Sequence, residues 1–154
     1  PSAVLGHWRR ASRTALGRWL FARMVCRKAP YFGTIKPRIL ELSPGIARVS
    51  MARRRGVENH IGSVHAIAMA NLCELAAGMM MEATLPQELR WIPRGMTIEY
   101  LQKAKTDVTA IARLDKTGWS DGENIGVPVT AFDTDGKEVT RAVITMYVSR
   151  RSAS

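Results

Sequence analysis

The sequence predicts an α+β domain in which an antiparallel sheet wraps around one central helix. The first observation is a stretch from about residue 62 to 82 that is rich in the helix formers Ala, Met and Leu and is apolar on almost every side. The second is that residues before and after this stretch alternate between apolar and polar, as half-buried strands do. A helix that is apolar all round has to be surrounded, and strands joined by hairpins form the sheet that surrounds it.

The individual strands follow from alternation and turn signals. Apolar runs at 39–42 and 46–51 flank Ser43-Pro44-Gly45, which predicts a hairpin. After the helix we expect strands at 91–100, with a bulge at Pro93-Arg94-Gly95, and then at 108–114, 125–131 and 139–148. Residues 133–136 form a tight turn between the last two strands, and the strands are expected to pair as sequential hairpins.

The positive charge is concentrated at one end of the chain. Nine of the lysines and arginines, and no acidic residue, precede Glu41, whereas the two signs nearly balance in the remainder of this chain of net charge +10. A nucleic-acid-binding domain would spread its basic residues over one face of the fold. We therefore expect no nucleic-acid partner.

The basic N-terminal segment, residues 1–30, predicts one amphipathic helix over about residues 2–27, followed by a domain over 35–150. Its apolar stripe recurs at three- and four-residue steps and comprises Leu5, Trp8, Ala15, Leu16, Trp19, Leu20 and Met24. Trp8, Leu16, Trp19 and Leu20 are expected to pack against the domain, a partner subunit or a membrane surface. The segment is Arg-rich and acid-free like a mitochondrial transit peptide but lacks the Ser richness of one.

Cysteine and histidine usage excludes several classes of protein. Cys26 and Cys73 are too few and too distant for a disulfide framework, which favours a reducing, cytoplasmic compartment. His60 and His65 have no third ligand at a metal-binding spacing, so we expect no metal. No phosphate-binding loop, dinucleotide fingerprint or serine nucleophile motif occurs, and no cofactor is expected.

Three polar residues interrupt the apolar central region, where polar groups are unfavourable unless paired or used. Asn59 precedes the predicted helix, His65 falls in its first turn, and Glu74 lies midway along it. Each has a structural alternative: Asn59 can shape a turn, His65 can be a hydrogen-bonded core side chain, and Glu74 can form a salt bridge.

Together these residues form the pattern Asn-x2-Gly-x2-His-x8-Glu followed by Leu-Ala-Ala-Gly, over residues 59–78. The pattern resembles the active-site segment of hotdog-fold acyl-CoA thioesterases of the phenylacetate-degradation and 4-hydroxybenzoyl-CoA type. The strand order extends the resemblance over 35–150. It implies a hotdog fold, an acyl-CoA substrate, and a homodimer or a dimer of such dimers.

The resemblance also implies roles for single residues. Glu74 would be the general base or nucleophile, and the Ala66 amide the donor to the thioester oxyanion, with Asn59 and His65 beside it. The chain departs from the family where the usual His-Gly-Gly is His65-Ala66-Ile67, and at Gly78, where some members have a hydroxyl residue. The first departure leaves a non-catalytic acyl-binding or dimer-scaffolding protein as the alternative.

Helix geometry adds an argument that does not depend on the resemblance. His65 and Glu74 are nine residues apart, which on an α-helix is a rise of about 13.5 Å and half a turn. They can serve one site only if two chains meet across a two-fold axis.

Further residues are candidates for contacts with the substrate. The small residues expected to allow its close approach are Gly62, Ala70 and Gly78. The candidates for contacts with the CoA phosphates are Arg90, Arg94 and Lys103, with Lys105 and Arg113 as further cations. Solvated surface charge is the alternative for each cation.

Overall fold

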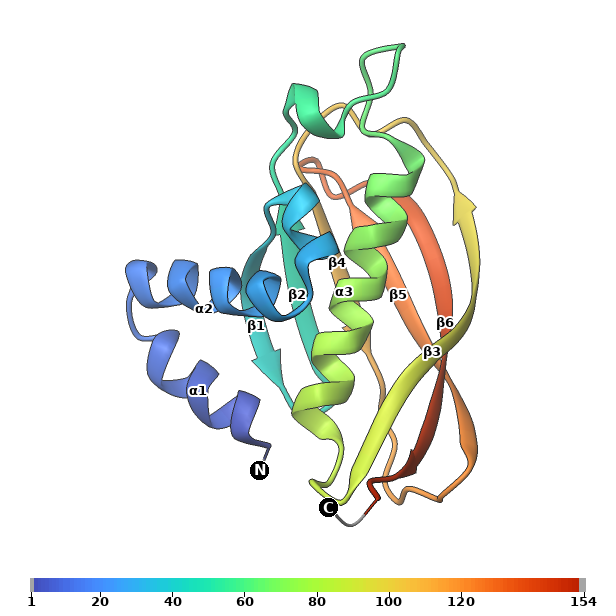
Figure 1. The fold of residues 1–154 in the computed structure, drawn as a ribbon. Coiled ribbons are helices and arrows are strands. Elements are labelled where there is room, and N and C mark those ends of the chain that lie inside the picture. The colour runs from blue at the N-terminus through green and yellow to red at the C-terminus, as the bar shows by residue number, and fades with distance from the viewer. Residues whose placement is uncertain (1, 153–154) are drawn as a thin grey trace.

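The structure, a computed structural model, describes residues 2–152 and contains one six-stranded antiparallel sheet with helix α3 (Ala66–Thr84) lying across one face (Figure 1). The strands are β1 (Arg38–Ser43), β2 (Ile46–Met51), β3 (Leu89–Tyr100), β4 (Val108–Arg113), β5 (Glu123–Phe132) and β6 (Glu138–Arg150). Side chains buried between α3, the sheet and the N-terminal helices form one hydrophobic core. This architecture confirms the predicted fold class.

The strand order is β1-β2-β4-β5-β6-β3. Both predicted hairpins, β1 with β2 and β5 with β6, are present, and the register shift predicted in β3 falls between Pro93 and Gly95. The expectation that β3 would pair with the next strand in sequence was wrong. Strand β4 already lies between β2 and β5, so β3 pairs with β6 instead and becomes an edge of the sheet.

Helix α3 begins at Ala66, three or four residues later than predicted. Gly62 has a left-handed backbone with φ of 76°, and the Val64 amide donates to the Ala104 carbonyl at 2.8 Å. Both features keep residues 62–64 out of the helix. Consequently His65 is the N-cap residue and does not lie in the first turn.

One stripe of α3 is not covered by the rest of the chain. Ile67 is 56% exposed, and Ala70 and Glu74, which follow at three- and four-residue steps, are only partly buried. The prediction that the helix is surrounded therefore holds everywhere except along this stripe, because the sheet, α1 and η1 cover the rest. The helix has the length and mean hydropathy of a membrane-spanning segment, but 67% of its apolar window is buried inside the molecule.

The N-terminal segment forms two helices, α1 (Ala3–Ala11) and α2 (Ala15–Lys28), not the single helix predicted; residue 1 lies outside the described range. Thr14 starts α2 by accepting a hydrogen bond from the Gly17 amide at 2.9 Å. The break lets α1 fold back so that Trp8 packs edge-on against Phe21, with ring centroids 5.2 Å apart. Two short 3-10 helices complete the chain, η1 (Pro30–Ile35) and η2 (Arg55–Val57).

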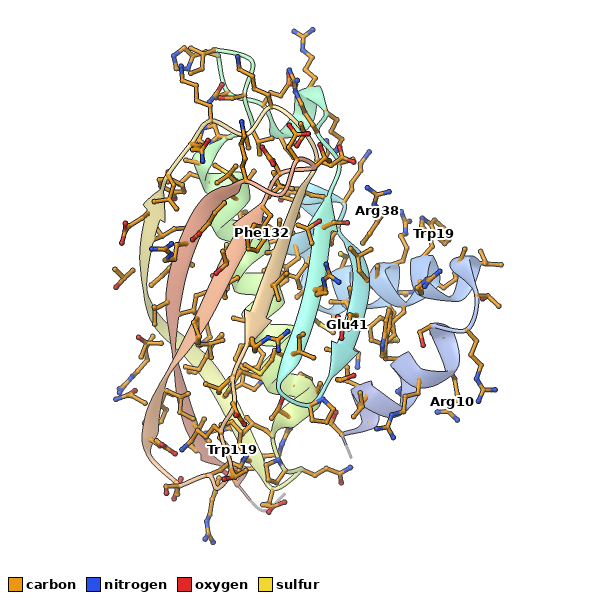
Figure 2. The ribbon with its side chains drawn as sticks, turned by 180° about the vertical axis from the view of Figure 1, so that it is seen from behind. Arg10, Trp19, Arg38, Glu41, Trp119 and Phe132 are labelled. Carbon is orange, nitrogen blue, oxygen red and sulfur yellow. The ribbon has the colours of Figure 1, made fainter. Side chains whose placement is uncertain are left out.

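This folding back changes which apolar residues are covered. Of the four stripe residues expected to pack, only Trp8 is buried, whereas Leu16, Trp19 and Leu20 are 66%, 55% and 52% exposed. The burial of Phe21 and Ala22 in their place turns the predicted stripe outward (Figure 2). Packing of these three residues against their own domain was thus a wrong expectation.

Candidate active site

Asn59 shapes the loop that leads into α3. Its Oδ1 accepts hydrogen bonds from the amides of Ile61 and Ser63, both at 3.1 Å, and its Nδ2 donates to Ser63 Oγ at 2.9 Å. The Asn59 amide also donates to the Ser63 carbonyl at 2.9 Å. These bonds close residues 59–63 into a compact turn of the kind that Asx side chains stabilise. Asn59 therefore has the structural role weighed for it, and a direct role in chemistry stays a prediction.

Arg53, which follows β2, ties this loop to the one after β3. Its guanidinium donates to Glu58 Oε1 at 2.6 Å, to the Lys105 carbonyl at 2.7 Å and to the Gly62 carbonyl at 2.9 Å. The Arg53 amide also donates to Asp107 Oδ1 at 2.8 Å. One side chain thus anchors the turn just before α3. The Lys105 carbonyl is 52 residues from Arg53 along the chain, so no local pattern could have revealed the link between the two loops.

Replacing Arg53 with glutamine is expected to loosen the 59–65 loop and to lower the free energy of unfolding by about 1 kcal/mol, because charge-assisted bonds at a partly exposed site are worth about that much. Hydrogen exchange of the Asn59 and Val64 amides should become faster. The matched control is Arg55→Gln, since the Arg55 side chain is exposed and makes no hydrogen bond within residues 2–152. Equal exchange rates in the two variants would contradict the anchoring role.

His65 and Ala66 define the chemistry at the start of α3. His65 Nδ1 accepts a hydrogen bond from the Ile67 amide at 3.0 Å, so the proton of the neutral ring lies on Nε2. Among the described residues, no atom accepts a hydrogen bond from the Ala66 amide. A free N–H at the positive end of a helix dipole favours a negatively charged oxygen. The Ala66 amide, which the resemblance assigns as the oxyanion donor, is therefore free to donate a hydrogen bond to a substrate oxygen.

Glu74 lies on the open stripe of α3, half-buried among apolar neighbours. Within the part of the chain that the structure describes, no hydrogen bond or ion pair engages its carboxylate. The salt bridge weighed as its structural explanation is thus not formed within one chain. Because His65 and Glu74 stand nine residues apart along one helix, the fold does not bring them together within a protomer.

Cys73 precedes Glu74 on α3, and Tyr100 at the end of β3 is its neighbour. Partial burial, with a smaller contribution from Cys73, raises the pKa of Tyr100, so its hydroxyl stays protonated and is able to donate a hydrogen bond. Burial raises the pKa of Cys73 to about 12. Thiolates are the reactive form of cysteine, so Cys73 is a packing residue and not a nucleophile.

A thiol-specific alkylating reagent at pH 8 is expected to modify Cys26 and to leave Cys73 unmodified until the chain is unfolded. With a pKa of about 12, the thiolate fraction of Cys73 at pH 8 is about one in ten thousand. Burial, partly offset by Arg23, also raises the pKa of Cys26, so its reaction should be slower than that of a free cysteine. Mass spectrometry of labelled peptides checks both points. Labelling of native Cys73 at the rate of Cys26 would contradict the prediction.

The cations proposed for CoA phosphates do not form one cluster. Arg90 donates to Ser149 Oγ at 3.2 Å, and Arg94 stacks over Tyr147 at 4.5 Å from the ring centroid. Both lie in the first half of β3. Lys103 follows the other end of β3, in the loop whose Ala104 carbonyl accepts a hydrogen bond from the Val64 amide. Of these three cations, Lys103 alone lies in a loop that contacts the segment before α3.

The small residues along α3 have different surroundings. Gly62 provides the left-handed turn before the helix, and Ala70 lies on the open stripe. Gly78 is covered by the Trp91 ring, which a Cβ at this position would approach to 2.8 Å. Trp91 Nε1 donates to Glu82 at 3.0 Å and holds the ring there. Thus Gly78 lets β3 close over the C-terminal half of α3, beside an apolar cleft of about 320 Å³.

Asn71 is a buried polar residue of α3 that the sequence pattern did not single out. It is 8% exposed, and its Nδ2 donates to Thr34 Oγ1 at 3.2 Å, whereas its Oδ1 has no partner among the described residues. It lines a cleft of about 190 Å³ together with His65 and Ile67. A buried carbonyl oxygen without a partner next to the start of α3 is an acceptor for a ligand or a water molecule.

The comparisons with known proteins agree with this fold. Residues 17–148 match a family model described as a domain of unknown function, DUF4442. A protein solved in a genomics project is 46% identical with a TM-score of 0.83, over 96% of this chain and 99% of that one. A Pseudomonas aeruginosa protein of unknown function, described as a probable thioesterase, is 24% identical with a TM-score of 0.75, over 84% of this chain and 93% of its own. A thioesterase family protein from Silicibacter pomeroyi is 20% identical with a TM-score of 0.72, over 84% and 96%. No curated protein matches the chain.

Proposed function

Because the chain belongs to the DUF4442 family and has the hotdog fold, we propose that it is an acyl-CoA thioesterase in which Glu74 acts on the thioester and the Ala66 amide stabilises the oxyanion. The observation that carries the proposal is a half-buried carboxylate on an otherwise apolar helix, at the spacing of the thioesterase motif from the amide that starts the helix, with neither group paired among residues 2–152. The descriptions of the Pseudomonas and Silicibacter proteins as thioesterases support it. The two free cysteines suit a cytoplasmic enzyme.

The chemistry requires a base beside a water molecule that can reach the thioester carbonyl carbon, and a hydrogen-bond donor at the carbonyl oxygen. As general base, Glu74 takes a proton from a water molecule whose oxygen attacks the carbonyl carbon. The carbonyl oxygen becomes negative and is held by the Ala66 amide. The tetrahedral intermediate then expels the CoA thiolate, which receives the proton from Glu74. The products are a carboxylic acid and CoA thiol.

A homodimer would bring these two groups together. β3 is a long edge strand with an unpaired side, and such edges pair readily with a second chain. Both elements also carry exposed apolar or aromatic side chains, Ile92 and Tyr100 on β3 and Ile67 on α3. Antiparallel pairing of two β3 edges around a two-fold axis would set the open stripe of one α3 against that of the other. Glu74 of one protomer would then face the helix start of its partner.

The same dimer would unite the candidate cations. Antiparallel pairing sets the Tyr100 end of one β3 beside the Leu89 end of the other. Lys103 of one protomer would therefore lie close to the region of Arg90 and Arg94 in the partner. Three cations from two chains would then be available for the phosphates of CoA.

The proposal is tested by turnover of an acyl-CoA panel that spans short aliphatic, long aliphatic and aromatic acyl groups, with release of CoA thiol as the signal. Hydrolysis of at least one member is the expected result. The bulky, exposed Ile67 at the mouth of the site favours one competing function, binding of acyl groups without turnover. Acyl-CoA binding by calorimetry with no thiol release from any member would replace the thioesterase proposal with that alternative.

A further inference from the structure

The outward side of α2 combines apolar and basic residues, and we call it the α2 surface. It comprises Leu16, Trp19, Leu20 and Met24, which are 66%, 55%, 52% and 36% exposed, with Arg23 and Arg27 among them. Arg23 stacks on the Trp19 ring, 5.2 Å from its centroid. Since Phe21 and Ala22 on the opposite side anchor α2 to the domain, this surface has no cover within residues 2–152.

A cleft of about 870 Å³ adjoins the α2 surface, between α2, η1 and the start of β1. Its lining includes Trp19 and Met24 and four cations, Arg23, Arg27, Lys36 and Arg38, and contains no carboxylate. Figure 2 shows Trp19 on α2 and Arg38 on β1 projecting from the same side of the molecule. Among the described residues only Arg38 of these four has an acidic partner, Asp107 at 3.4 Å.

We propose that the α2 surface and this cleft bind an anionic phospholipid bilayer. Exposed Trp and Leu side chains enter the boundary between headgroups and acyl chains, and the cations beside them contact lipid phosphates. The charge distribution supports this occupant, because no acidic residue precedes Glu41 and the basic residues there can face anionic lipid without like-charge repulsion.

Two other occupants fit the surface less well. A second copy related by a two-fold axis would set Arg23, Arg27 and Lys36 against their own symmetry mates, which is unfavourable for like charges. Nucleic acid would meet the cations, but its phosphate backbone offers no apolar layer for Leu16 and Leu20, which are among the most exposed large apolar residues of the chain.

The test is co-sedimentation of the full chain with vesicles of phosphatidylglycerol and phosphatidylcholine, compared with phosphatidylcholine alone. Binding is expected to the anionic vesicles only and to be released by high salt. Arg23→Gln/Arg27→Gln should weaken the affinity for anionic vesicles by about 30-fold, because each cation at a membrane surface contributes a factor of roughly five. Leu16→Ser/Leu20→Ser should weaken it by at least as much with the charge retained. The matched control, Arg113→Gln/Lys137→Gln, removes two exposed cations elsewhere and should change binding by less than about twofold.

Insertion gives a second signal. Lipids with brominated acyl chains should quench the fluorescence of Trp19, and Trp19→Phe should abolish the quenching, whereas Trp119→Phe should not. The proposal would be overturned if Arg113→Gln/Lys137→Gln weakened vesicle binding as much as Arg23→Gln/Arg27→Gln does. Vesicle binding without quenching of the Trp19 fluorescence would also overturn it. So would preferential binding of single-stranded nucleic acid through Arg23 and Arg27, or a fall in oligomeric mass in Leu16→Ser/Leu20→Ser. Unchanged thermal unfolding verifies that each variant is folded. None of these results depends on thioester hydrolysis.

Discussion

Replacing Glu74 with glutamine is expected to lower kcat by about 100-fold or more and to leave the fold intact. Loss of a positioned general base typically costs a factor of this size, and loss of a carboxylate nucleophile costs more. Stability should stay the same or rise slightly, because the variant removes a half-buried charge that has no partner within the described chain. Steady-state release of CoA thiol and a thermal unfolding curve measure the two effects.

The control for this experiment is Glu88→Gln, which removes an exposed carboxylate that follows α3. Its turnover should stay within about twofold of the wild type, the range of a surface change away from the chemistry. If Glu74→Gln were as active as Glu88→Gln, the assignment of Glu74 would be wrong. A Glu74→Gln protein that loses both activity and its cooperative unfolding transition would instead show that Glu74 supports the fold.

Mixing inactive Asn59→Ala protein with inactive Glu74→Gln protein is expected to restore about one quarter of the wild-type activity. If each site takes its helix start from one chain and Glu74 from the other, a mixed dimer holds one intact and one doubly damaged site. Equal mixing makes about half of the dimers mixed, and half of their sites work. The loss in Asn59→Ala follows from its three side-chain bonds, which shape the loop before α3.

The control mixture pairs Asn59→Ala with His65→Ala. Both substitutions damage the same side of the site, so every site in a mixed dimer carries one of them and no activity should return. Light scattering verifies the dimer, and mass spectrometry of differently tagged chains verifies subunit exchange. Exchange without recovery in the first mixture, or equal recovery in both, would show that the site is not shared between chains.

Much of the candidate site could be predicted because its signals are local. The spacing of Asn59, His65 and Glu74 is a property of the chain, and a carboxylate in an apolar helix is conspicuous in any fold. The link that Arg53 makes between two loops could not be predicted, since it joins Glu58 and the Gly62 carbonyl to the Lys105 carbonyl, which is 52 residues away. The buried acceptor on Asn71 could not be predicted either. Only the fold brings Thr34 to its Nδ2 and leaves its Oδ1 without a partner among the described residues.

The sequence by itself determined the elements whose signals are periodic or confined to a turn: the hairpin at Pro44-Gly45, the bulged β3, the hairpin of β5 and β6, and the apolar central helix. Alternation and turn chemistry act over a few residues and do not need the rest of the fold. Tertiary structure decided the rest. The packing of Trp8 on Phe21 holds α1 against α2 and leaves Trp19 facing outward, the Val64–Ala104 bond delays the start of α3, and the occupied edges of β4 leave β3 to pair with β6. Each of these outcomes depends on a contact between separate elements of the fold, which the local sequence pattern does not record.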